Sequence, residues 1–218
     1  MYLVNKEKIN QLLSTKIVDA RIAQVFNSFK EVLVTSSFGT TLAVLLHLVS
    51  RIAPDCPVYF IDTGYHFSET LAYKERVGRL LDLKIIDLRP DPADHSMTEK
   101  KQLWSQDPDQ CCDINKVEPL DRVKQGHNVW MSGLIGFQNR NRSDLEIVDE
   151  EEEIIKFHPL IDWNTSLVEE YIESHSLPEH PLKKQGYHSV GCTHCTVAGM
   201  GRNGRWADGS KTECGLHK

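Results

Sequence analysis

EVLVTSSFGTTLAVLLHLVSRI, residues 31–52, joins an apolar strand pattern to an apolar helical pattern through a loop of small residues. Glu31–Thr35 predicts a buried strand, and Thr40–Ile52 predicts a helix. A strand that leads through a short loop into a helix is the first half of a βαβ unit, from which parallel sheets are built. This stretch therefore indicates an α/β fold.

The same alternation continues along the chain, which predicts a mainly parallel, twisted sheet flanked by helices. Residues 5–28 have helical periodicity and are expected to pack against the sheet, whereas residues 150–158 predict a weaker strand. The remaining strands are expected at Val58–Asp62, Lys84–Leu88 and Asn128–Ser132, and the remaining helices at Ser68–Leu81, Asp113–Lys124 and Ser166–His175.

Length and composition narrow the class of protein. The 218 residues are 40% hydrophobic and 26% charged, as in an ordinary globular chain of one domain or at most two. A net charge of −6 without a basic stripe argues against nucleic-acid binding. No apolar run is long enough for a membrane span and no secretory signal is visible, so we expect a cytoplasmic protein. The acidic run Asp149–Glu153 is expected to be a solvated loop between two strands.

Two loops at the ends of consecutive predicted strands could hold an anion. Ser36, Ser37 and Gly39 follow the first strand and precede a helix, where backbone N–H groups and the helix dipole favour phosphate. An ordinary capped helix start fits this loop as well. Thr63 and Gly64 follow the second strand. Because ligands of open α/β sheets bind outside the carboxyl ends of the strands, the two loops together indicate a nucleotide site.

Six cysteines in a reducing compartment point to metal or redox chemistry rather than to disulfides. Cys56 is expected to be a small core residue. An adjacent pair and a CxxC pair supply four thiolates, enough for one zinc ion or one [4Fe-4S] cluster. Adjacent cysteines bind a single ion awkwardly, so the cluster is favoured and zinc stays as the alternative. The four candidate ligands are Cys111, Cys112, Cys192 and Cys195.

Cys214 stands apart near the C-terminus, in KTECGLH. A core role is not expected there, and Lys211 and His217 are expected to favour its thiolate. Gly215 gives the backbone room to bring the thiol into a closed site. The alternative is a free surface thiol.

The segments TSSFG, DTGYHFSET, CCDINKVEPL, HPLIDW, CTHC, GRW and KTECGLH together resemble the assimilatory sulfonucleotide reductases, in their cluster-bearing adenylyl-sulfate (APS) branch. The resemblance runs from about Glu31 to the C-terminus. It implies an adenine-nucleotide α-hydrolase-like fold in one domain, residues 1–218. Residues 1–29 would form N-terminal helices, residues 30–185 a nucleotide-binding core, and residues 186–218 a cluster-binding and mobile catalytic tail.

The resemblance also implies a reaction, the reduction of APS to sulfite and AMP in sulfate assimilation and cysteine biosynthesis. Cys214 would attack the sulfur of APS and form an S-sulfocysteine, from which thioredoxin or glutaredoxin would release sulfite. The alternative is phosphoadenylyl sulfate (PAPS), alone or together with APS, with adenosine 3′,5′-bisphosphate as the leaving group. We expect APS, and we expect a homo-oligomer.

The roles of further residues follow from the resemblance alone. It places Lys116 between cluster and substrate, and it assigns Arg202 and Arg205 to phosphate and sulfate. The implied substrate-binding set is Ser36, Ser37, Gly39, Thr63, Gly64, Lys116, Arg142, Arg202, Arg205 and His217, and the implied cluster ligands are Cys111, Cys112, Cys192 and Cys195.

One segment departs from the family pattern. Where the family has GLRR, this chain has Gly133-Leu134-Ile135-Gly136. Either Arg140 and Arg142 compensate for the two absent arginines, or the substrate clamp is altered. The rival from another class is a zinc-stabilised nucleotide-binding protein without reductase activity. An ATP pyrophosphatase is less favoured, because Ser36–Gly39 lacks the aspartate that handles magnesium in such a loop.

Overall fold

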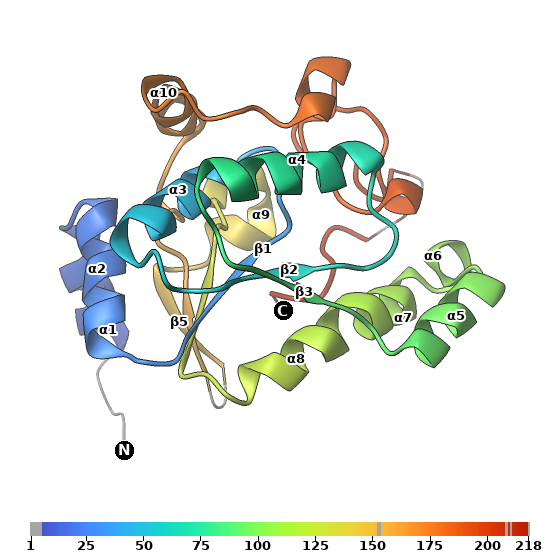
Figure 1. Ribbon diagram of the computed structural model, residues 1–218, viewed down its shortest axis with the longest axis horizontal. Helices are drawn as coiled ribbons and strands as arrows, with labels where there is room; N and C mark the ends of the chain where they lie inside the picture. The colour runs from blue at the N-terminus through green and yellow to red at the C-terminus, as the bar shows by residue number, and fades with distance from the viewer. Residues whose placement is uncertain (1–5, 152–153, 208, 210, 218) are drawn as a thin grey trace.

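The computed structural model describes residues 6–151, 154–207, 209 and 211–217, and its centre is a six-stranded sheet of order β3-β2-β1-β4-β6-β5 (Figure 1). Five strands are parallel and β5 joins one edge antiparallel to β6. This confirms the predicted α/β class with a mainly parallel sheet. The strands are β1 (Val32–Ser36), β2 (Val58–Ile61), β3 (Ile85–Leu88), β4 (Val129–Ser132), β5 (Val148–Glu151) and β6 (Ile154–Phe157).

Strand β1 lies at the centre, and all five of its residues are buried. Val34 pairs with Val58 of β2 on one side and with Met131 of β4 on the other. The chain leaves β1 toward β2 and later returns to its other side with β4, so the strand order reverses there. At such a point the loops beyond the carboxyl ends diverge and open a crevice.

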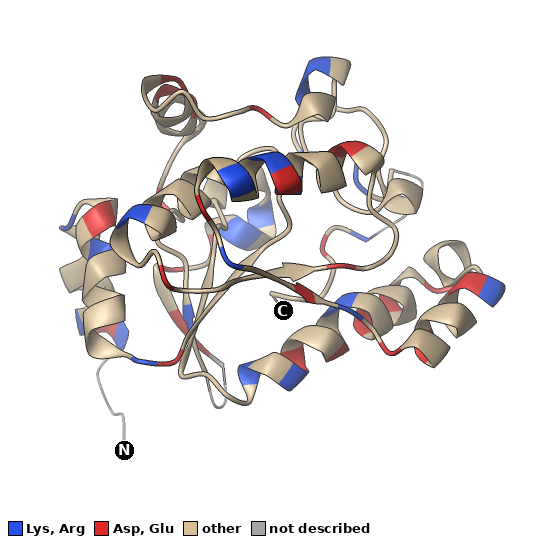
Figure 2. Cartoon of the chain, viewed as in Figure 1, with Lys and Arg blue, Asp and Glu red and all other residues tan. Residues whose placement is uncertain are grey.

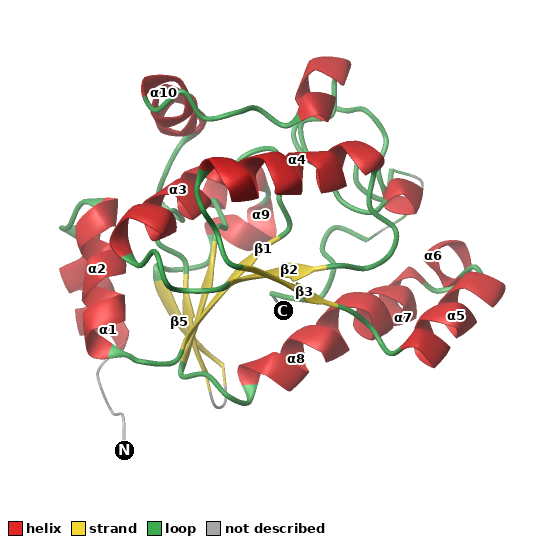
Figure 3. Cartoon of the chain, viewed as in Figure 1, coloured by secondary structure: helices red, strands yellow, loops and turns green. Residues whose placement is uncertain are grey.

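Helices cover the two faces of the sheet unequally (Figures 1 and 3). The larger core joins α2, α3 and α10 to one face, and it includes Leu45, Phe60 and Phe157. The smaller core lies under α8, where Leu120 packs with Trp130. The helices that form these layers are α1 (Lys6–Ser14), α2 (Val18–Ser28), α3 (Ala43–Ile52), α4 (Ser68–Leu80), α8 (Glu118–Lys124) and α10 (Thr165–Ser174).

The N-terminal helices are tied to the sheet by buried polar contacts. Asn10 both donates to and accepts from the backbone of Val148, at 2.9 and 2.8 Å. Arg21 is only 4% exposed, and it binds the carboxylate of Asp162 through two nitrogens, at 2.7 and 2.6 Å. Its Nε donates to the carbonyl of Leu13 at 2.8 Å. The predicted packing of this region against the core is therefore observed for residues 6–28.

Two regions differ from the sequence-based expectation. The acidic run is not wholly a loop, because Asp149–Glu151 belong to β5, which pairs with β6; Glu152 and Glu153 lie outside the described residues. Helix α3 begins at Ala43 rather than at Thr40. Phe38 has φ of 48°, and Leu42 N–H donates to the Gly39 carbonyl at 3.3 Å, so a turn occupies the predicted first helical residues.

The predicted helix Asp113–Lys124 is the end of a longer helical region. Helices α5 (Pro92–Lys100), α6 (Leu103–Gln106) and α7 (Pro108–Cys112) come first, and a π-helical turn over Asp113–Val117 joins α7 to α8. Cys111 and Cys112 therefore end the short helix α7, directly before this turn. Asp91 and Asp107 cap α5 and α7 through their side chains, each just before a proline.

After α10 the chain folds back over the carboxyl ends of the strands with little regular structure. The short elements here and after β4 are Gly136–Gln138, α9 (Arg140–Ser143), Pro181–Gln185 and Thr193–Cys195. An isolated bridge joins Cys192 to His66. Figure 2 shows both signs of charge side by side along α4. In the described residues, no helix is long and apolar enough to cross a membrane.

Candidate active site

A pocket opens at the carboxyl ends of β1, β2 and β4, where the strand order reverses. Its walls come from the loops after these strands, from the loop that carries CTHC, and from the C-terminal tail. Of the residues singled out by the sequence analysis for substrate binding and catalysis, the lining contains Ser36, Ser37, Gly39, Thr63, Lys116, Arg142, Arg202, Arg205, Cys214 and His217.

The loop after β1 is held in one shape by local contacts. Ser36 Oγ accepts the backbone N–H of Phe38 at 3.0 Å, and Phe38 is fully buried. Thr40 Oγ1 donates to the carbonyl of His188 at 2.8 Å, which ties this loop to the one that leads into CTHC. Ser37 and Gly39 are thereby presented to the pocket.

The loop after β2 contributes Thr63 and His66, whereas Gly64 is not in the pocket lining. Gly64 has φ of +74°, and a Cβ there would lie 2.7 Å from the ring of His95. The turn therefore requires glycine at this position. Thr63 Oγ1 lies 3.4 Å from Cys192 Sγ. Sequence reasoning missed His66, whose Nε2 bonds to the Ile61 carbonyl at 2.9 Å and whose buried Nδ1 has no partner. Its place two residues after the turn glycine was the available signal.

The four candidate metal ligands come from two distant segments that meet beside the pocket. Cys111 and Cys192 pack in one buried cluster with Cys195 at its edge, and Cys112 interacts electrostatically with Cys192. Burial, reinforced by the neighbouring thiols, raises the pKa of Cys111 to about 12. All six cysteines are free thiols. Among the described residues, no group of three or more His, Cys, Asp or Glu side chains is arranged to hold a single metal ion.

Lys116 joins the cysteine region to the pocket. It lies on the π-helical turn, is 8% exposed, and lines the pocket. Burial by itself lowers the pKa of an ammonium group, but Cys192, Cys112 and Cys214 outweigh it and raise the pKa of Lys116. Burial raises the pKa of the Cys192 thiol, but Lys116 and the Thr63 hydroxyl outweigh it and bring this pKa below its usual value. The lysine is therefore a buried cation whose partners are sulfur atoms.

The C-terminal tail closes one side of the pocket with Cys214. Lys211 Nζ donates to the Pro108 carbonyl at 2.9 Å and pairs with Asp109, so this lysine is directed to the start of α7. Lys116 and Arg202 both interact electrostatically with Cys214. Cys214 is half-buried, and Gly215 turns the chain with φ of +87°.

Beyond this turn, His217 lies flat against Trp130, with ring centroids 4.5 Å apart. Burial, together with His158 and Arg142, holds the pKa of His217 well below its usual value, so the ring is neutral. His158 is fully buried. Its Nδ1 shares a hydrogen bond with Ser132 Oγ at 3.0 Å, and its Nε2 has no hydrogen-bond partner among the described residues. Leu216 and His217 are thus anchored on the α8 face of the sheet, where Leu216 packs against the smaller core.

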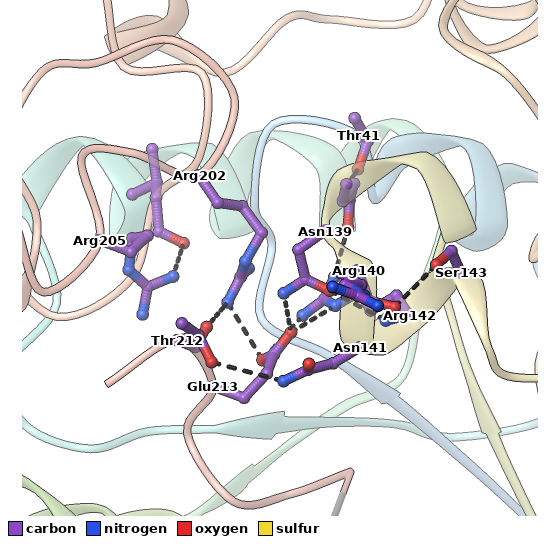
Figure 4. A network of polar contacts seen from close by, with 12 residues as sticks. Thr41, Asn139, Arg140, Asn141, Arg142, Ser143, Arg202, Arg205, Thr212 and Glu213 are labelled. Carbon is purple, nitrogen blue, oxygen red and sulfur yellow. Dashed lines mark hydrogen bonds and ion pairs between the residues drawn. The ribbon is translucent and has the colours of Figure 1, made fainter. Parts of the chain in front are cut away.

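Arginine side chains gather around the tail residue directly before Cys214 (Figure 4). Arg142 and Arg202 both bind the carboxylate of Glu213, with closest distances of 2.7 and 3.1 Å. Arg205 donates to the carbonyl of Val190 at 3.4 Å and lies over the ring of Trp206. Burial, with the charge of Arg142, lowers the pKa of Arg202 to about 10.

The segment that departs from the family pattern lies behind this wall. Ile135 is fully buried, and a Cβ on Gly136 would lie 2.8 Å from the carbonyl oxygen of Ile161. Arg140 is exposed and is not part of the pocket lining, whereas Arg142 is part of it. Of the two arginines that could compensate, only Arg142 reaches the pocket.

Comparison with known proteins identifies the family. Residues 31–198 match the phosphoadenosine phosphosulfate reductase domain. The chain is 37% identical to adenosine 5′-phosphosulfate reductase of Halalkalibacterium halodurans, over 99% of this chain and 97% of that protein. It is 39% identical to the enzyme of the same name from Bacillus cytotoxicus, over 86% of this chain and 84% of that protein.

Solved structures agree with this result. Phosphoadenylyl-sulfate reductase from Candida auris, in a phosphate complex, superposes with a TM-score of 0.79 at 26% identity, over 90% of this chain and 99% of that one. FMN adenylyltransferase of Candida glabrata superposes with a TM-score of 0.63 at 15% identity, over 88% of this chain and 66% of that one, which shows a shared fold alone. The chain belongs to the phosphoadenosine phosphosulfate reductase family.

Proposed function

We propose that this protein reduces adenosine 5′-phosphosulfate to sulfite and AMP, with Cys214 as the nucleophile. The observation that carries the proposal is the position of Cys214, which lines the same pocket as the hydroxyl-rich loop after β1 and the cations Lys116 and Arg205. A binding protein would need no thiol on a tail folded into its nucleotide pocket. The relatives with 37% and 39% identity carry the name of this activity.

The reaction needs two thiol steps. The Cys214 thiolate attacks the sulfur of the sulfonyl group, an S–S bond forms, and the S–O bond to the phosphate breaks. AMP leaves with the electron pair of that bond, so an S-sulfocysteine remains on the protein. A dithiol reductant then attacks Cys214 Sγ, sulfite leaves with the S–S electron pair, and the second thiol of the reductant resolves the mixed disulfide. The two electrons come from the dithiol, for which we propose thioredoxin, with glutaredoxin as the alternative.

The residues of the pocket supply charge neutralisation and positioning. Negative charge develops on the phosphate oxygen as the S–O bond breaks, and buried cations at that place stabilise it. Lys116 and Arg205 line the pocket and are proposed for this role. Ser36, Ser37, Gly39 and Thr63 are proposed to bind the nucleotide. Since AMP is a stable anion, no general acid is required for its departure.

Cys111, Cys112, Cys192 and Cys195 are proposed to hold a [4Fe-4S] cluster. The donor set fits, because four free thiols from two segments meet beside the pocket and a buried lysine adjoins them. A cluster binds each thiolate to a different iron and so tolerates the adjacent pair Cys111-Cys112 better than one zinc ion does. When bound, the cluster would supply electrostatic and structural support rather than electrons. Zinc is the alternative.

APS is the proposed substrate, and PAPS is the second candidate. The serine-rich loop after β1 could receive a 3′-phosphate, and the Candida auris relative of similar structure is named a PAPS reductase. We further propose a cytoplasmic enzyme of sulfate assimilation that leads to cysteine. We also propose that it acts as a homo-oligomer and folds as one domain, with residues 1–29, 30–185 and 186–218 as N-terminal helices, core and catalytic tail.

The test is sulfite release from APS and from PAPS, side by side, by anaerobically purified protein with thioredoxin and its reductase. We expect turnover of APS with the higher efficiency, and loss of turnover in Cys214→Ser with unchanged iron content and colour. Loss of colour in Cys214→Ser would contradict its assignment as nucleophile. A colourless, zinc-loaded wild-type protein without turnover would support the nucleotide-binding rival.

A further inference from the structure

The carboxylate of Glu213, next to the nucleophile, is enclosed by donors (Figure 4). Its Oε1 accepts from Asn139 Nδ2 and Arg142 Nε, both at 2.7 Å. Its Oε2 accepts from Arg202 Nη2 at 3.1 Å and Arg142 Nη2 at 3.3 Å. The three charged side chains are only 11–13% exposed. Burial would raise the pKa of this carboxyl, but the bonds to Arg142 and Asn139 and the charge of Arg202 hold it below its usual value.

These contacts join the tail to two other segments of the chain. Arg142 comes from α9, after β4, and Arg202 comes from the loop after CTHC. Arg202 Nη2 also donates to the carbonyl of Thr212 at 3.2 Å, and Asn141 Nδ2 donates to Thr212 Oγ1 at 3.4 Å. The two residues directly before Cys214 are therefore fixed to the pocket wall.

The residues after Cys214 are anchored on the other side. Gly215 turns the chain in a left-handed conformation, Leu216 packs against the smaller core, and His217 stacks on Trp130. Cys214 is thus held between a polar anchor and an apolar one. A reacting group fixed in this way loses little further freedom when it reaches the transition state.

The cations of the pocket divide into two pairs. Arg142 and Arg202 have a carboxylate from the chain itself. Lys116 and Arg205 also line the pocket, and for neither is an ion pair with a carboxylate found in the part of the chain that the structure describes. One pair therefore binds a carboxylate of the tail, whereas the partners of the other pair are the cysteine thiols for Lys116 and the Val190 carbonyl for Arg205.

We propose that Glu213 is a positioning residue for Cys214, docked by Arg142 and Arg202, and that the phosphosulfate group is bound by Lys116 and Arg205. This inference rests on the proposed function. It changes the expectation that Arg142 and Arg202 bind substrate, since their charge is used to hold the tail that carries the nucleophile.

The test compares Glu213→Gln, which keeps the shape and removes the charge, with Glu213→Asp, which keeps the charge on a shorter stem. The matched control is Glu179→Gln, because Glu179 pairs with Lys183 at 2.7 Å on the surface, outside the pocket. Trypsin releases the peptide TECGLHK, residues 212–218, so alkylation of Cys214 by iodoacetamide is followed by mass spectrometry. AMP affinity is measured by calorimetry on the same proteins.

We expect Cys214 in Glu213→Gln to be alkylated about tenfold faster, because charge-assisted bonds that hold the tail are lost. AMP affinity should stay within about twofold of wild type. The alkylation rate of Glu213→Asp should lie between those of wild type and Glu213→Gln, and the rate of Glu179→Gln should match wild type. Unchanged alkylation in Glu213→Gln would overturn the proposal. So would an AMP affinity that rises about tenfold, because Glu213 would then compete with the ligand for the arginines.

A second readout measures the nucleophile directly. With APS and no reductant, the rate of sulfonate transfer to Cys214 in Glu213→Gln should fall more than about tenfold at saturating APS, with little change in the APS concentration for half-maximal rate. An unchanged rate at saturation would contradict a positioning role. If wild-type protein accepts no sulfonate from APS, the proposed function fails, whereas the difference in alkylation still tests the docking of the tail.

Discussion

Gly204 is a position where one methyl group should disturb the loop of residues 197–205, which carries Arg202 and Arg205. A Cβ built on Gly204 would lie 2.1 Å from the carbonyl oxygen of Val197 and 3.1 Å from its carbonyl carbon. The two sides of this loop are hydrogen-bonded to each other there, since Val197 N–H donates to the Gly204 carbonyl at 2.8 Å. Because the Cβ would meet the backbone of Val197 rather than a flexible side chain, Gly204→Ala must force the two sides of the loop apart by about 1 Å, which costs about 1–3 kcal/mol.

Arg202 and Arg205 flank this glycine, so the distortion should appear as a loss of AMP affinity. At about 1.4 kcal/mol for each factor of ten, we expect Gly204→Ala to weaken AMP binding by about fivefold to about hundredfold. Calorimetry gives the affinity, and iron content and melting temperature are recorded in parallel. The matched control is Gly209→Ala, whose Cβ would come no nearer than 3.8 Å to any described residue beyond its chain neighbours. Wild-type affinity in Gly204→Ala would refute the steric reasoning.

Three other predictions concern stability and the cysteine site. Arg21→Met should lower the free energy of unfolding by about 1–3 kcal/mol in urea titrations, because it leaves the buried carbonyls of Leu13 and Pro159 without their donor; a loss below about 0.5 kcal/mol would contradict this. Burial lowers the pKa of His158 from 6.5 to about 4, so the folded state favours the neutral ring. The free energy of unfolding therefore does not depend on the protonation of His158 above pH 6.5. It falls by about 3 kcal/mol in all as the pH drops from 6.5 to about 4, because the unfolded state then binds the proton more readily. His158→Gln should remove that part of the pH dependence of unfolding, and an unchanged slope would show that His158 does not cause it. Cys112→Ala should bleach the anaerobically purified protein, and iron analysis that equals wild type would exclude Cys112 as a ligand.

The strands were predictable because their pattern is local. The central strands β1 and β4 are buried throughout, so each forms a short apolar run that periodicity detects, and β1 to β4 lie within one residue of their expected bounds. The edge strand β5 was missed because Asp149–Glu151 are acidic. An edge strand has one partner and faces solvent, so its sequence need not be apolar.

The helical region around the cysteine pair was only partly predictable. The acids Asp91 and Asp107 cap α5 and α7 just before prolines, and this signal was present in the sequence. The π-helical turn that carries Lys116 has no such local signal. Tertiary contacts with the CTHC segment determine how the lysine is placed there.

The pocket shows a similar division. Residue types at loop positions and a family resemblance singled out eleven residues for substrate binding and catalysis, and all of them except Gly64 line the pocket, because these features follow the chain. The partner of Arg142 and Arg202 was not predicted, since Glu213 lies 71 residues after Arg142 and charge in a sequence does not indicate which groups meet. His158 was missed for the same reason, because only the fold brings it beneath the pocket, whereas His66 lies in the loop after β2 that was already expected at the site.

The most direct test of the account is the mass of the protein after incubation with APS in the absence of any reductant. The account predicts one added sulfonate per chain, located on the peptide TECGLHK at Cys214, with one AMP released for each sulfonate gained. AMP release without a sulfonate on Cys214, or a sulfonate on another cysteine, would contradict the assignment of Cys214 as the nucleophile.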